Sequence, residues 1–448
     1  VYAIAADGCN GSTSTFYNAC NESNILHVVS LPNAESGAVN SSCNNSDLDD
    51  CGYFDSGPAT GPFTITDDST GGDCTTIGDW SSASKTCTLS KNLDGPIIIG
   101  SNDVTVDGNA KSITGTYTSL NPSASTFAEG VKMEGVTGVT IKNIIINNVR
   151  SGIYLSSSEN NVIQDNTLSN NGYGVNLYNS PSNIITSNTI NSDDGYGIKV
   201  DRSHLTVISN NVQSGASNGV EVSNSNQLTI EDNSFKNNQH GLYLNNVGTI
   251  SVLNNVLESN AQTGMRVDRG GWHIITGNTI ENGLTGIELI SSEQNTLSSN
   301  TASNNDGNGI RISGGTGNIL TDNVANDNQQ SGFLIESDSD PATFTGNTAT
   351  GNTLSDFEGI IVNVIGSTLS IDDTGGDCST IGDWNSATKT CTLTLDFISD
   401  SVGIVIASDG ITLDGNGHTI SGAGSSASQE DWGVDARFKD NFTIKNLN

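Results

Sequence analysis

The sequence predicts an all-β chain wound into a right-handed parallel β-helix, with three short strands in each coil of 22–23 residues. A glycine followed by alternating apolar residues recurs ten times, and an asparagine follows most of these glycines at a fixed distance. Asn and Gly, which are poor helix formers, interrupt every stretch that could otherwise form a helix. The position of each expected strand in a coil is then given by its distance from the repeat glycine.

The glycines of the repeat are Gly130, Gly152, Gly174, Gly197, Gly219, Gly241, Gly264, Gly286, Gly309 and Gly332. The first expected strand carries apolar residues one and three places after the glycine, such as Ile153 and Leu155. The second carries one at place 11, such as Ile163, and the third carries one at place 16, such as Leu168. Alternation with period two directs these residues to one face, which we expect to be the core.

An asparagine stands 14 residues after eight of the glycines, at Asn166, Asn188, Asn211, Asn233, Asn255, Asn278, Asn300 and Asn323. After Gly332 it comes one place late, at Asn347, and after Gly130 the position holds Ile144. We expect an inward ladder of amides that bond from coil to coil and satisfy buried polar groups at a sharp turn. The variable segment after this position, including Asn238, is expected to be an outward loop that tolerates substitution.

The strongly acidic charge balance restricts the kinds of molecule that the chain can bind. Lys and Arg number 16 against 49 Asp and Glu, which gives a net charge of -33. Such a chain repels nucleic-acid phosphates and anionic lipid, and is compatible with cations or a neutral polysaccharide. No apolar run is long enough to predict a membrane span.

Eight cysteines form short-range pairs outside any CxxC motif, which favours disulfides in an extracytoplasmic compartment. Cys74–Cys87 and Cys378–Cys391 share the same spacing of 13 residues, and we expect both as disulfides. Cys9–Cys20 and Cys43–Cys51 are the favoured pairs of the N-terminal region, although four cysteines allow three pairings.

In addition to the repeated coils, the sequence contains a longer duplicated segment. Residues 67–115 and 372–422 share the strings TIGDW and KTCTL, and Trp80 matches Trp384. Each Cys-Trp segment is expected to cap the open N-terminal end of a β-helix, with the tryptophan in the cap core. The expected organisation is an N-terminal region at 1–66, a capped β-helix at 67–366, and a second cap with the first coils of another β-helix at 367–448.

The second module is expected to end near its first coils, because Phe442–Asn446 parallels Val139–Asn143. The first rod is expected to be covered at its C-terminal end by Ile360–Ile371 and the second cap. Residues 1–66 carry the sequons Asn10, Asn21, Asn40 and Asn44, and Asn441 is a further one, so glycosylation is a hypothesis in a suitable source. Chance in an Asn- and Ser-rich stretch explains the sequons equally well.

The coils resemble the parallel β-helix repeat family of NosD-like periplasmic proteins and secreted surface proteins, over about residues 95–360. The resemblance implies the fold but not one function, since the family includes lyases, hydrolases, epimerases and inert surface rods. The DPHD signature of mannuronan epimerases is absent, and the histidines that copper handling would need are scattered, as His27, His204, His240, His273 and His418.

The outward position two places after each glycine forms one column, in which Lys199 lies beside Glu221 and Glu288 lies between Arg266 and Arg311. This column is either a ladder of alternating charges or part of a carbohydrate-binding face. The candidate carbohydrate residues are Lys199, Asp201, Arg202, Tyr243, Arg266, Asp268, Arg269 and Trp272. Asp201 and Asp268 lie three coils apart, about 14 Å, which is too far for the pair to hydrolyse one bond.

Two acidic turns are the candidate calcium sites, because carboxylates at close spacing around two glycines can surround the ion. The six residues are Asp67, Asp68, Asp73, Asp372, Asp373 and Asp377. Asp and Gly also form tight turns without any ion. Apart from calcium, no cofactor is expected.

The favoured function is structural: a secreted or cell-surface protein that forms a filament, sheath or surface layer. The alternative is a carbohydrate-binding rod or a polysaccharide-degrading enzyme of the lyase or hydrolase type. For assembly we expect head-to-tail polymers, in which residues 1–66 of one copy dock on residues 400–448 of the next. A natural chain that continues past Asn448 and completes its own second rod is the rival explanation.

Overall fold

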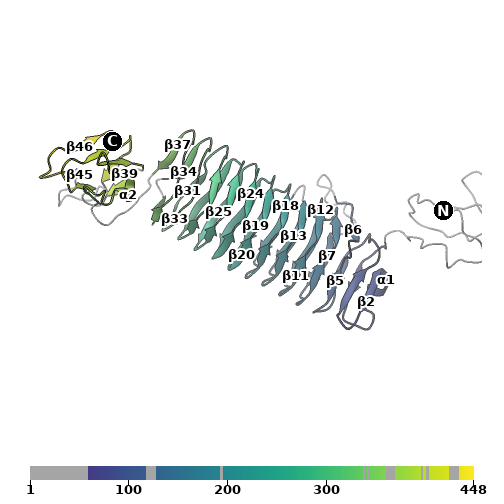
Figure 1. Ribbon diagram of the computed structural model, residues 1–448. Coiled ribbons are helices and arrows are strands. Elements are labelled where there is room, and N and C mark those ends of the chain that lie inside the picture. The colour runs from purple at the N-terminus through teal and green to yellow at the C-terminus, as the bar shows by residue number, and fades with distance from the viewer. Residues whose placement is uncertain are drawn as a thin grey trace, which may run out of the picture.

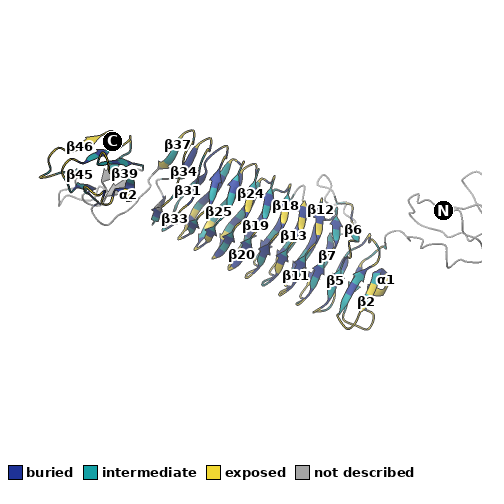
Figure 2. Ribbon diagram, viewed as in Figure 1, coloured by how far each residue is buried: buried dark blue, intermediate teal, exposed yellow. Residues whose placement is uncertain are grey.

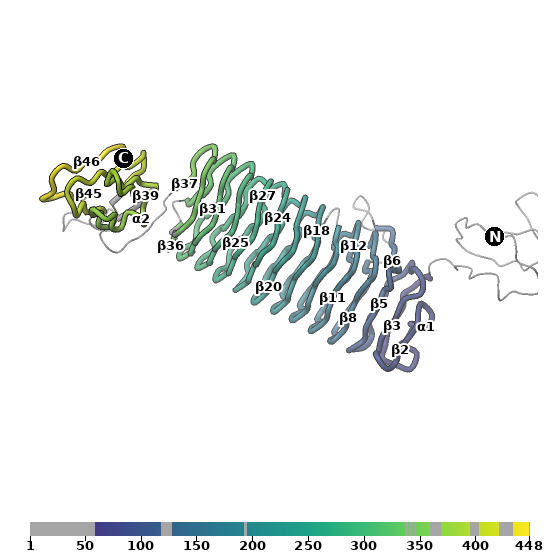
Figure 3. Tube along the Cα trace, viewed as in Figure 1, coloured from purple at the N-terminus to yellow at the C-terminus, as the bar shows by residue number. Residues whose placement is uncertain are grey.

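The computed structural model describes residues 59–117, 128–191, 195–336, 339–340, 343–359, 369–394, 397–399, 403–422 and 433–447. Its first module is a right-handed parallel β-helix, a rod whose coils stack along one axis (Figures 1 and 3). Three parallel sheets run along the rod and form its sides. The fold class predicted from the repeat is therefore confirmed.

Sheet 1 has 13 strands. They are β1 (Phe63–Ile65), β4 (Ile97–Ile99), β7 (Glu129–Glu134), β10 (Ser151–Ser156), β13 (Tyr173–Tyr178), β16 (Tyr196–Asp201), β19 (Asn218–Ser223), β22 (His240–Val247), β25 (Thr263–Gly271), β28 (Thr285–Glu293), β31 (Ile310–Ser313), β34 (Ser331–Ile335) and β37 (Ser355–Gly359).

Sheet 2 also has 13 strands. They are β2 (Gly78–Ser81), β3 (Thr86–Leu89), β5 (Thr105–Asp107), β8 (Thr140–Lys142), β11 (Val162–Gln164), β14 (Ile184–Thr186), β17 (Val207–Ser209), β20 (Leu228–Glu231), β23 (Ile250–Leu253), β26 (Ile274–Thr276), β29 (Thr296–Ser298), β33 (Ile319–Thr321) and β36 (Thr343–Thr345).

Sheet 3 has nine strands. They are β6 (Ser112–Thr114), β9 (Ile145–Asn147), β12 (Thr167–Ser169), β15 (Thr189–Asn191), β18 (Val212–Ser214), β21 (Ser234–Lys236), β24 (Val256–Glu258), β27 (Thr279–Glu281) and β30 (Thr301–Ser303). Two short strands, β32 (Gly315–Thr316) and β35 (Ser339–Asp340), pair in parallel as a separate two-stranded sheet.

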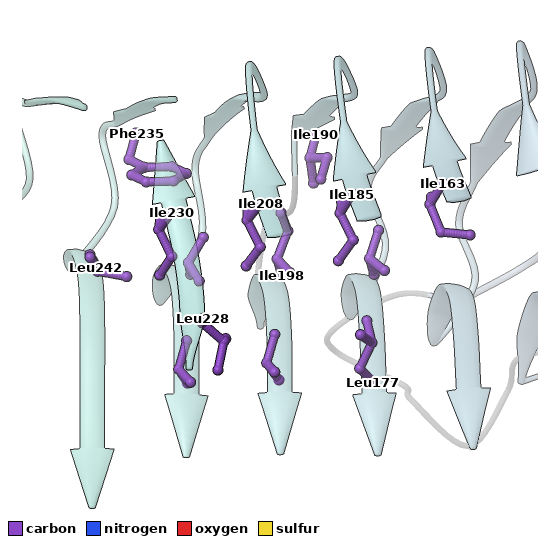
Figure 4. Packing of buried hydrophobic residues seen from close by; sticks show 14 of the residues in the cluster. Ile163, Leu177, Ile185, Ile190, Ile198, Ile208, Leu228, Ile230, Phe235 and Leu242 are labelled. Atoms are coloured by element: carbon purple, nitrogen blue, oxygen red, sulfur yellow. The ribbon is translucent and has the colours of Figure 1, made fainter. Parts of the chain in front are cut away.

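The core of the rod is a set of aliphatic columns, and Figure 2 shows buried residues on strands along the whole rod. The register pairs each core residue with its equivalent one coil away, as in Ile163 with Ile185 and Ile185 with Ile208. Figure 4 shows these isoleucines and Ile230 at equivalent positions of successive coils, facing residues such as Leu177 and Ile198 from sheet 1. The positions predicted to be inward are buried, so the period-two assignment is confirmed.

The repeated glycine is required by close packing between coils. A Cβ atom on Gly174 would lie 2.4 Å from Cγ2 of Ile190 and 2.5 Å from the carbonyl oxygen of Gly197. Equivalent contacts with the next coil recur at Gly152, Gly219 and Gly241. Any larger residue there would push the coils apart, which explains why the glycine marks the period.

The predicted asparagine ladder forms the turn between sheets 2 and 3. In it, the backbone N–H of Asn233 donates to Oδ1 of Asn255 at 3.0 Å, and the Asn233 side-chain amide donates to the Ile208 carbonyl at 2.9 Å. Ile144, at the first position, donates its N–H to Oδ1 of Asn166. Each amide therefore satisfies buried backbone groups of its own and of neighbouring coils.

The expectation that Asn238 lies in an outward loop is wrong. Asn238 is 2% exposed and belongs to a second ladder, at the turn between sheets 3 and 1. Its Oδ1 accepts from the N–H of Ala216 at 2.9 Å, and its side-chain amide donates to Oδ1 of Asn260 at 3.1 Å. A tight turn with buried backbone groups needs the same satisfaction at this corner as at the other.

The cap of the first module consists of α1 (Cys74–Ile77) and the hairpin of β2 and β3, which are antiparallel to each other. The Cys74–Cys87 disulfide joins α1 to β3, with a Cα–Cα distance of 5.7 Å. Trp80 is partly buried against the core and lies over Gly71, where a Cβ atom would meet its ring at 2.4 Å. Strand β1 pairs with β4, so the module begins at or before Phe63 rather than at residue 67.

The second module repeats this cap with β38 (Leu369–Ile371), α2 (Cys378–Ile381), β39 (Gly382–Asn385) and β40 (Thr390–Leu393). The Cys378–Cys391 disulfide is present, with a Cα–Cα distance of 5.8 Å. Its further strands are β41 (Phe397–Ser399), β42 (Ile404–Ile406), β43 (Thr412–Asp414), β44 (Ile420–Gly422), β45 (Val434–Asp435) and β46 (Thr443–Lys445). Strand β46 pairs with β43 as β8 pairs with β5, which confirms the predicted parallel between the two stretches.

Phenylalanines occupy the C-terminal end of the first module. Phe333, Phe344 and Phe357 form a cluster, with ring centroids 5.1–5.8 Å apart. Leu369 and Ile371 instead belong to the core of the second module, so the expectation that Ile360–Ile371 covers the first rod is wrong for these residues. Residues 360–368 lie outside the described residues. In the described part of the chain, no helix has the length and apolar character needed to span a bilayer.

Candidate functional site

The outer face of sheet 1 carries three columns of side chains, one place before and two and four places after each repeat glycine. In the central column the register places Lys199 beside Glu221, and Glu288 between Arg266 and Arg311, as predicted. The columns two and four places after the glycine are neighbours because alternate residues of a strand point to the same face. The column before the glycine lies three residues from the central column, because the glycine and the residue after it are both buried. Together they form a single surface along the rod.

The N-terminal part of this surface is a tyrosine patch, made of Tyr173, Tyr178, Tyr196, Lys199 and Arg202 on or next to β13 and β16. The Lys199 ammonium lies 5.1 Å from the Tyr196 ring centroid and 5.9 Å from that of Tyr173. The Arg202 guanidinium lies 5.6 Å from the Tyr178 ring and donates to its hydroxyl at 2.9 Å. These are cation–π contacts, and they orient the rings on the face.

Neither Lys199 nor Arg202 forms an ion pair with a described residue. Asp201 is next to Arg202 in sequence, but its Oδ1 accepts from the Asn224 side-chain amide at 2.9 Å. Glu221 accepts from the Asn218 amide at 2.8 Å. Burial, and then the nearby Glu221 carboxylate, raise the pKa of Tyr196 to about 12, so this hydroxyl stays protonated. Among the described residues, the patch therefore presents tyrosine rings and two cations that form no ion pair within 4.0 Å.

The C-terminal part of the surface is an ion network, made of Arg266, Asp268, Glu288, Arg311 and Glu336. Arg266 bonds Glu288 at 3.0 Å and contacts Asp268 at 3.6 Å. Arg311 bonds Glu288 at 2.5 Å and also pairs with Glu336. The hydrogen bond from Ser313, followed by Arg311, holds the pKa of Glu336 below its usual value. Each carboxylate of this network is engaged by a guanidinium.

Tyr243 and His240 lie between the two parts. Tyr243 stacks on His240 with ring centroids 5.6 Å apart, and the Arg266 guanidinium lies 5.8 Å from the Tyr243 ring. Burial lowers the pKa of His240, and Arg266 lowers it further. Arg269 bonds Asp268 at 3.3 Å, and Trp272, 57% exposed, follows the end of β25.

The structure therefore brings the candidate carbohydrate residues onto or next to one sheet, although Trp272 lies at the turn that leaves it. Sequence reasoning missed Tyr173, Tyr178, Tyr196, His240 and Glu336. Their signal was available, because Tyr173, Tyr196 and His240 precede a repeat glycine by one place and Tyr178 and Glu336 follow one by four. Only the register shows that these columns are adjacent.

The acidic turns have other partners in the structure. Asp68 accepts from the N–H groups of Thr70 and Gly72, and these bonds, with those from the Thr66 and Thr70 hydroxyls, hold its pKa far below the usual range. Asp67 pairs with Lys85 at 2.7 Å. Asp73 and Asp377 accept from Thr64 N–H and Ser370 N–H, each at 2.8 Å.

Asp372 bonds Thr374 in the same way as Asp68 bonds Thr70, and Asp373 is next to it in the turn. Within the described ranges, no group of three or more His, Cys, Asp or Glu side chains is arranged to hold a metal. Calcium at these turns remains a prediction. Of the predicted sequons, Asn441 is exposed, and Asn10, Asn21, Asn40 and Asn44 lie outside the described residues, as do Cys9, Cys20, Cys43 and Cys51.

Two family models match the chain. The model described as "Right handed beta helix region" matches residues 218–374, and that described as "Periplasmic copper-binding protein (NosD)" matches residues 79–273. The described residues do not fit a copper site of histidine and methionine, because Met133 and Met265 are both fully buried in the core and the histidines form no cluster. A comparison with curated proteins found no match.

Among solved structures, the periplasmic alginate epimerase AlgG is similar at 14% identity and a TM-score of 0.48, over 61% of this chain and 79% of that one. The Azotobacter vinelandii mannuronan C-5 epimerase AlgE6 A-module is similar at 12% identity and 0.46, over 61% and 84%. An exopolygalacturonase from Thermotoga maritima is similar at 11% identity and 0.35, over 58% and 72%. Likeness at this level concerns the fold and not the activity.

The two disulfides are typical of a protein that folds outside the cytoplasm. The two matching family models agree with the stacked coils and the corner ladders, because all of them indicate a parallel β-helix. The chain has the right-handed parallel β-helix fold and is similar to these two β-helix repeat families over residues 218–374 and 79–273.

Proposed function

We propose that this chain is a secreted or cell-surface rod that binds a polysaccharide along the outer face of sheet 1 and does not cleave it. The observation that carries the proposal is the tyrosine patch, in which Tyr173, Tyr178 and Tyr196 are oriented by two cations that no described acid pairs with. Tyrosine rings stack on sugar rings, and cations and hydroxyls bond their polar groups. A rod offers such contacts to several consecutive sugars.

The ion network supports binding rather than cleavage. A glycosidase acid needs a raised pKa and its partner carboxylate must be available to the sugar. Here Arg266 and Arg311 both engage Glu288, which is 7% exposed, and Arg311 also engages Glu336, whose pKa is lowered. The C-terminal part of the face is therefore better suited to hold the sheet together than to transfer protons.

The test is retention of the purified chain on immobilised polysaccharides, one neutral panel and one uronate-bearing panel, with product analysis for cleavage. We expect retention without new reducing ends or unsaturated products. Tyr196→Ala and Lys199→Ala should weaken retention at least tenfold. Val212→Ala, on the exposed face of sheet 3, is the matched control and should bind as the parent does.

Loss of retention in all three variants, or retention by none of the polysaccharides, would contradict the proposal. Release of shortened chains by the parent protein would replace binding with cleavage as the function. In that case the ion network, and not the tyrosine patch, would be the first place to look for catalytic residues.

Assembly is the second candidate function. The observation that favours it is the edge of β46, where Ile444 is 40% exposed although its counterpart Ile141 in the first module is fully buried. A further β segment would cover this edge, from a longer chain or from a neighbouring copy. The proposed donor, residues 1–66, is largely outside the described residues. Deleting residues 1–30 should abolish polymers, and polymers of unchanged length would rule this docking out.

A further inference from the structure

The outer face of sheet 2 carries fewer charged side chains than the outer face of sheet 1. From β11 to β33 its 16 outward positions hold one charged residue, Glu231. The others are hydroxyl, amide or aliphatic side chains, and the aliphatic ones are Val162, Ile184, Val207, Leu253, Ile274 and Ile319. Acids occupy the turns beside the strip, including Asp165 and Asp232. In a chain of net charge -33, a like-charged body meets little repulsion from the side chains of this strip.

The strip is also apolar for an exposed surface. Ile184, Ile274 and Ile319 are 41%, 45% and 37% exposed. At the turn that leads from sheet 1 into sheet 2, Leu205 and Trp272 are 52% and 57% exposed, and each stands two residues before an outward strand position. An apolar centre framed by charged turns is the usual arrangement of a protein interface, and exposed tryptophan is enriched there.

We propose that a second copy of this chain docks on this face, so that two rods pack side by side through sheet 2. The outer face of sheet 2 is large enough for a specific interface between two copies. Eight strands spaced about 4.8 Å apart give a strip about 38 Å long, and with its flanking turns it is about 15 Å wide. Two copies would bury on the order of 1,200 Å² in total, which is the lower end of the range for specific interfaces. The same patch is used on both copies, so the contact closes as a dimer.

This contact goes beyond the proposed function, because it leaves the outer face of sheet 1 free. A dimer of rods would present two polysaccharide-binding faces. It would also differ from head-to-tail assembly, which uses the ends of the rods.

The experiment compares two double variants of the full chain by sedimentation velocity over a range of protein concentrations, at low salt and at 0.5 M salt. Ile184→Glu with Ile274→Glu places two charges on sheet 2. Val212→Glu with Val256→Glu places two charges at similarly exposed valines of sheet 3, which are 52% and 37% exposed. Circular dichroism and thermal melting check that both variants fold.

We expect the parent chain to dimerise more tightly at high salt, because screening reduces the repulsion between acidic rods. The sheet 2 variant should be monomeric, with its dissociation constant raised at least 100-fold, and the sheet 3 variant should dimerise as the parent does. A parent chain that stays monomeric at both salts would overturn the proposal. So would equal dissociation of both variants, or assembly that the sheet 2 variant leaves unchanged.

A further outcome concerns another occupant of the face. If the parent chain is monomeric and the sheet 2 variant loses retention on polysaccharide, the face binds glycan and not a second copy. That result also overturns self-docking.

Discussion

The two modules share one cap but differ in what stands on it. Both have the disulfide across 13 residues, the carboxylate that accepts a backbone N–H at 2.8 Å, and the tryptophan over a glycine of positive φ. They also share an ion pair between equivalent strands. Lys142 on β8 pairs with Asp107 on β5 at 3.2 Å, and Lys445 on β46 pairs with Asp414 on β43 at 2.8 Å. The first module then adds many further coils, whereas the described residues of the second module include ten buried core residues.

The difference teaches that the cap specifies where a rod begins and the coils supply most of its stability. Each added coil buries one more layer of aliphatic residues and satisfies the corner amides of the layer before it. The second module, with few layers, depends more on its cross-link. The following predictions use this contrast.

The largest effect is expected from removing the disulfides. A cross-link that closes a loop of this length contributes about 3 kcal/mol. Cys378→Ser with Cys391→Ser should unfold the second module, because its small core has little stability to lose. Cys74→Ser with Cys87→Ser should leave the first module folded. Hydrogen exchange resolved by peptide would show this, and equal loss of protection in both modules would contradict it.

Both asparagine ladders, at the turn between sheets 2 and 3 and at the turn between sheets 3 and 1, should stabilise the first module. Asn238→Leu and Asn255→Leu each remove the acceptor and donors of a buried amide, so each should lower the free energy of unfolding by about 1–3 kcal/mol. Asn226→Leu, at an exposed turn position, is the control and should have little effect. Chemical denaturation measures the three variants. A small effect at Asn238 alone would mean that the second ladder contributes little.

Acid should destabilise the first module through His273. This side chain is 1% exposed, neither ring nitrogen has a hydrogen-bond partner among the described residues, and burial lowers its pKa to about 4. The unfolded chain binds a proton near the usual histidine pKa of about 6.5, so stability is full above that pH and is lost as the pH falls toward 4. The loss at pH 5 should be about 2 kcal/mol.

His273→Asn tests this dependence, because Asn295 occupies the same corner one coil later and its Oδ1 accepts from the His273 N–H. The variant should lose the part of the acid sensitivity between pH 6.5 and pH 4. Thermal melting across this range is the measurement. An unchanged slope in the variant would show that other groups control the acid response.

The smallest effect is expected at the duplicated ion pairs. Lys142→Met and Lys445→Met remove partly exposed pairs, so each should change the stability of its module by less than about 1 kcal/mol, and less still in high salt. A clearly larger shift at Lys445 than at Lys142 would mean that the second module uses this pair in place of missing coils.

Much of the candidate site could be read from the sequence, because a repeat of constant length fixes which residues share a column. Lys199, Glu221, Arg266, Glu288 and Arg311 were placed in order along the rod in this way. The neighbouring tyrosines were not, since adjacency between columns depends on how the strands of one coil are oriented. That Lys199 lies over Tyr173 and Tyr196 is a property of the folded sheet.

The sequence by itself determined the coil length, the aliphatic columns, the first asparagine ladder, the two cap disulfides and the duplication. These features are local or strictly periodic, so spacing alone expresses them. Only the tertiary structure decided the second ladder, because Ala216 and Gly283 interrupt its period while their N–H groups still donate to Asn238 and Asn305. It also decided that the outward residues of sheet 2 from β11 to β33, of which Glu231 is the one charged residue, form one continuous strip. Adjacency between coils creates both features, since residues about 22 apart in the chain lie about 4.8 Å apart in the stack.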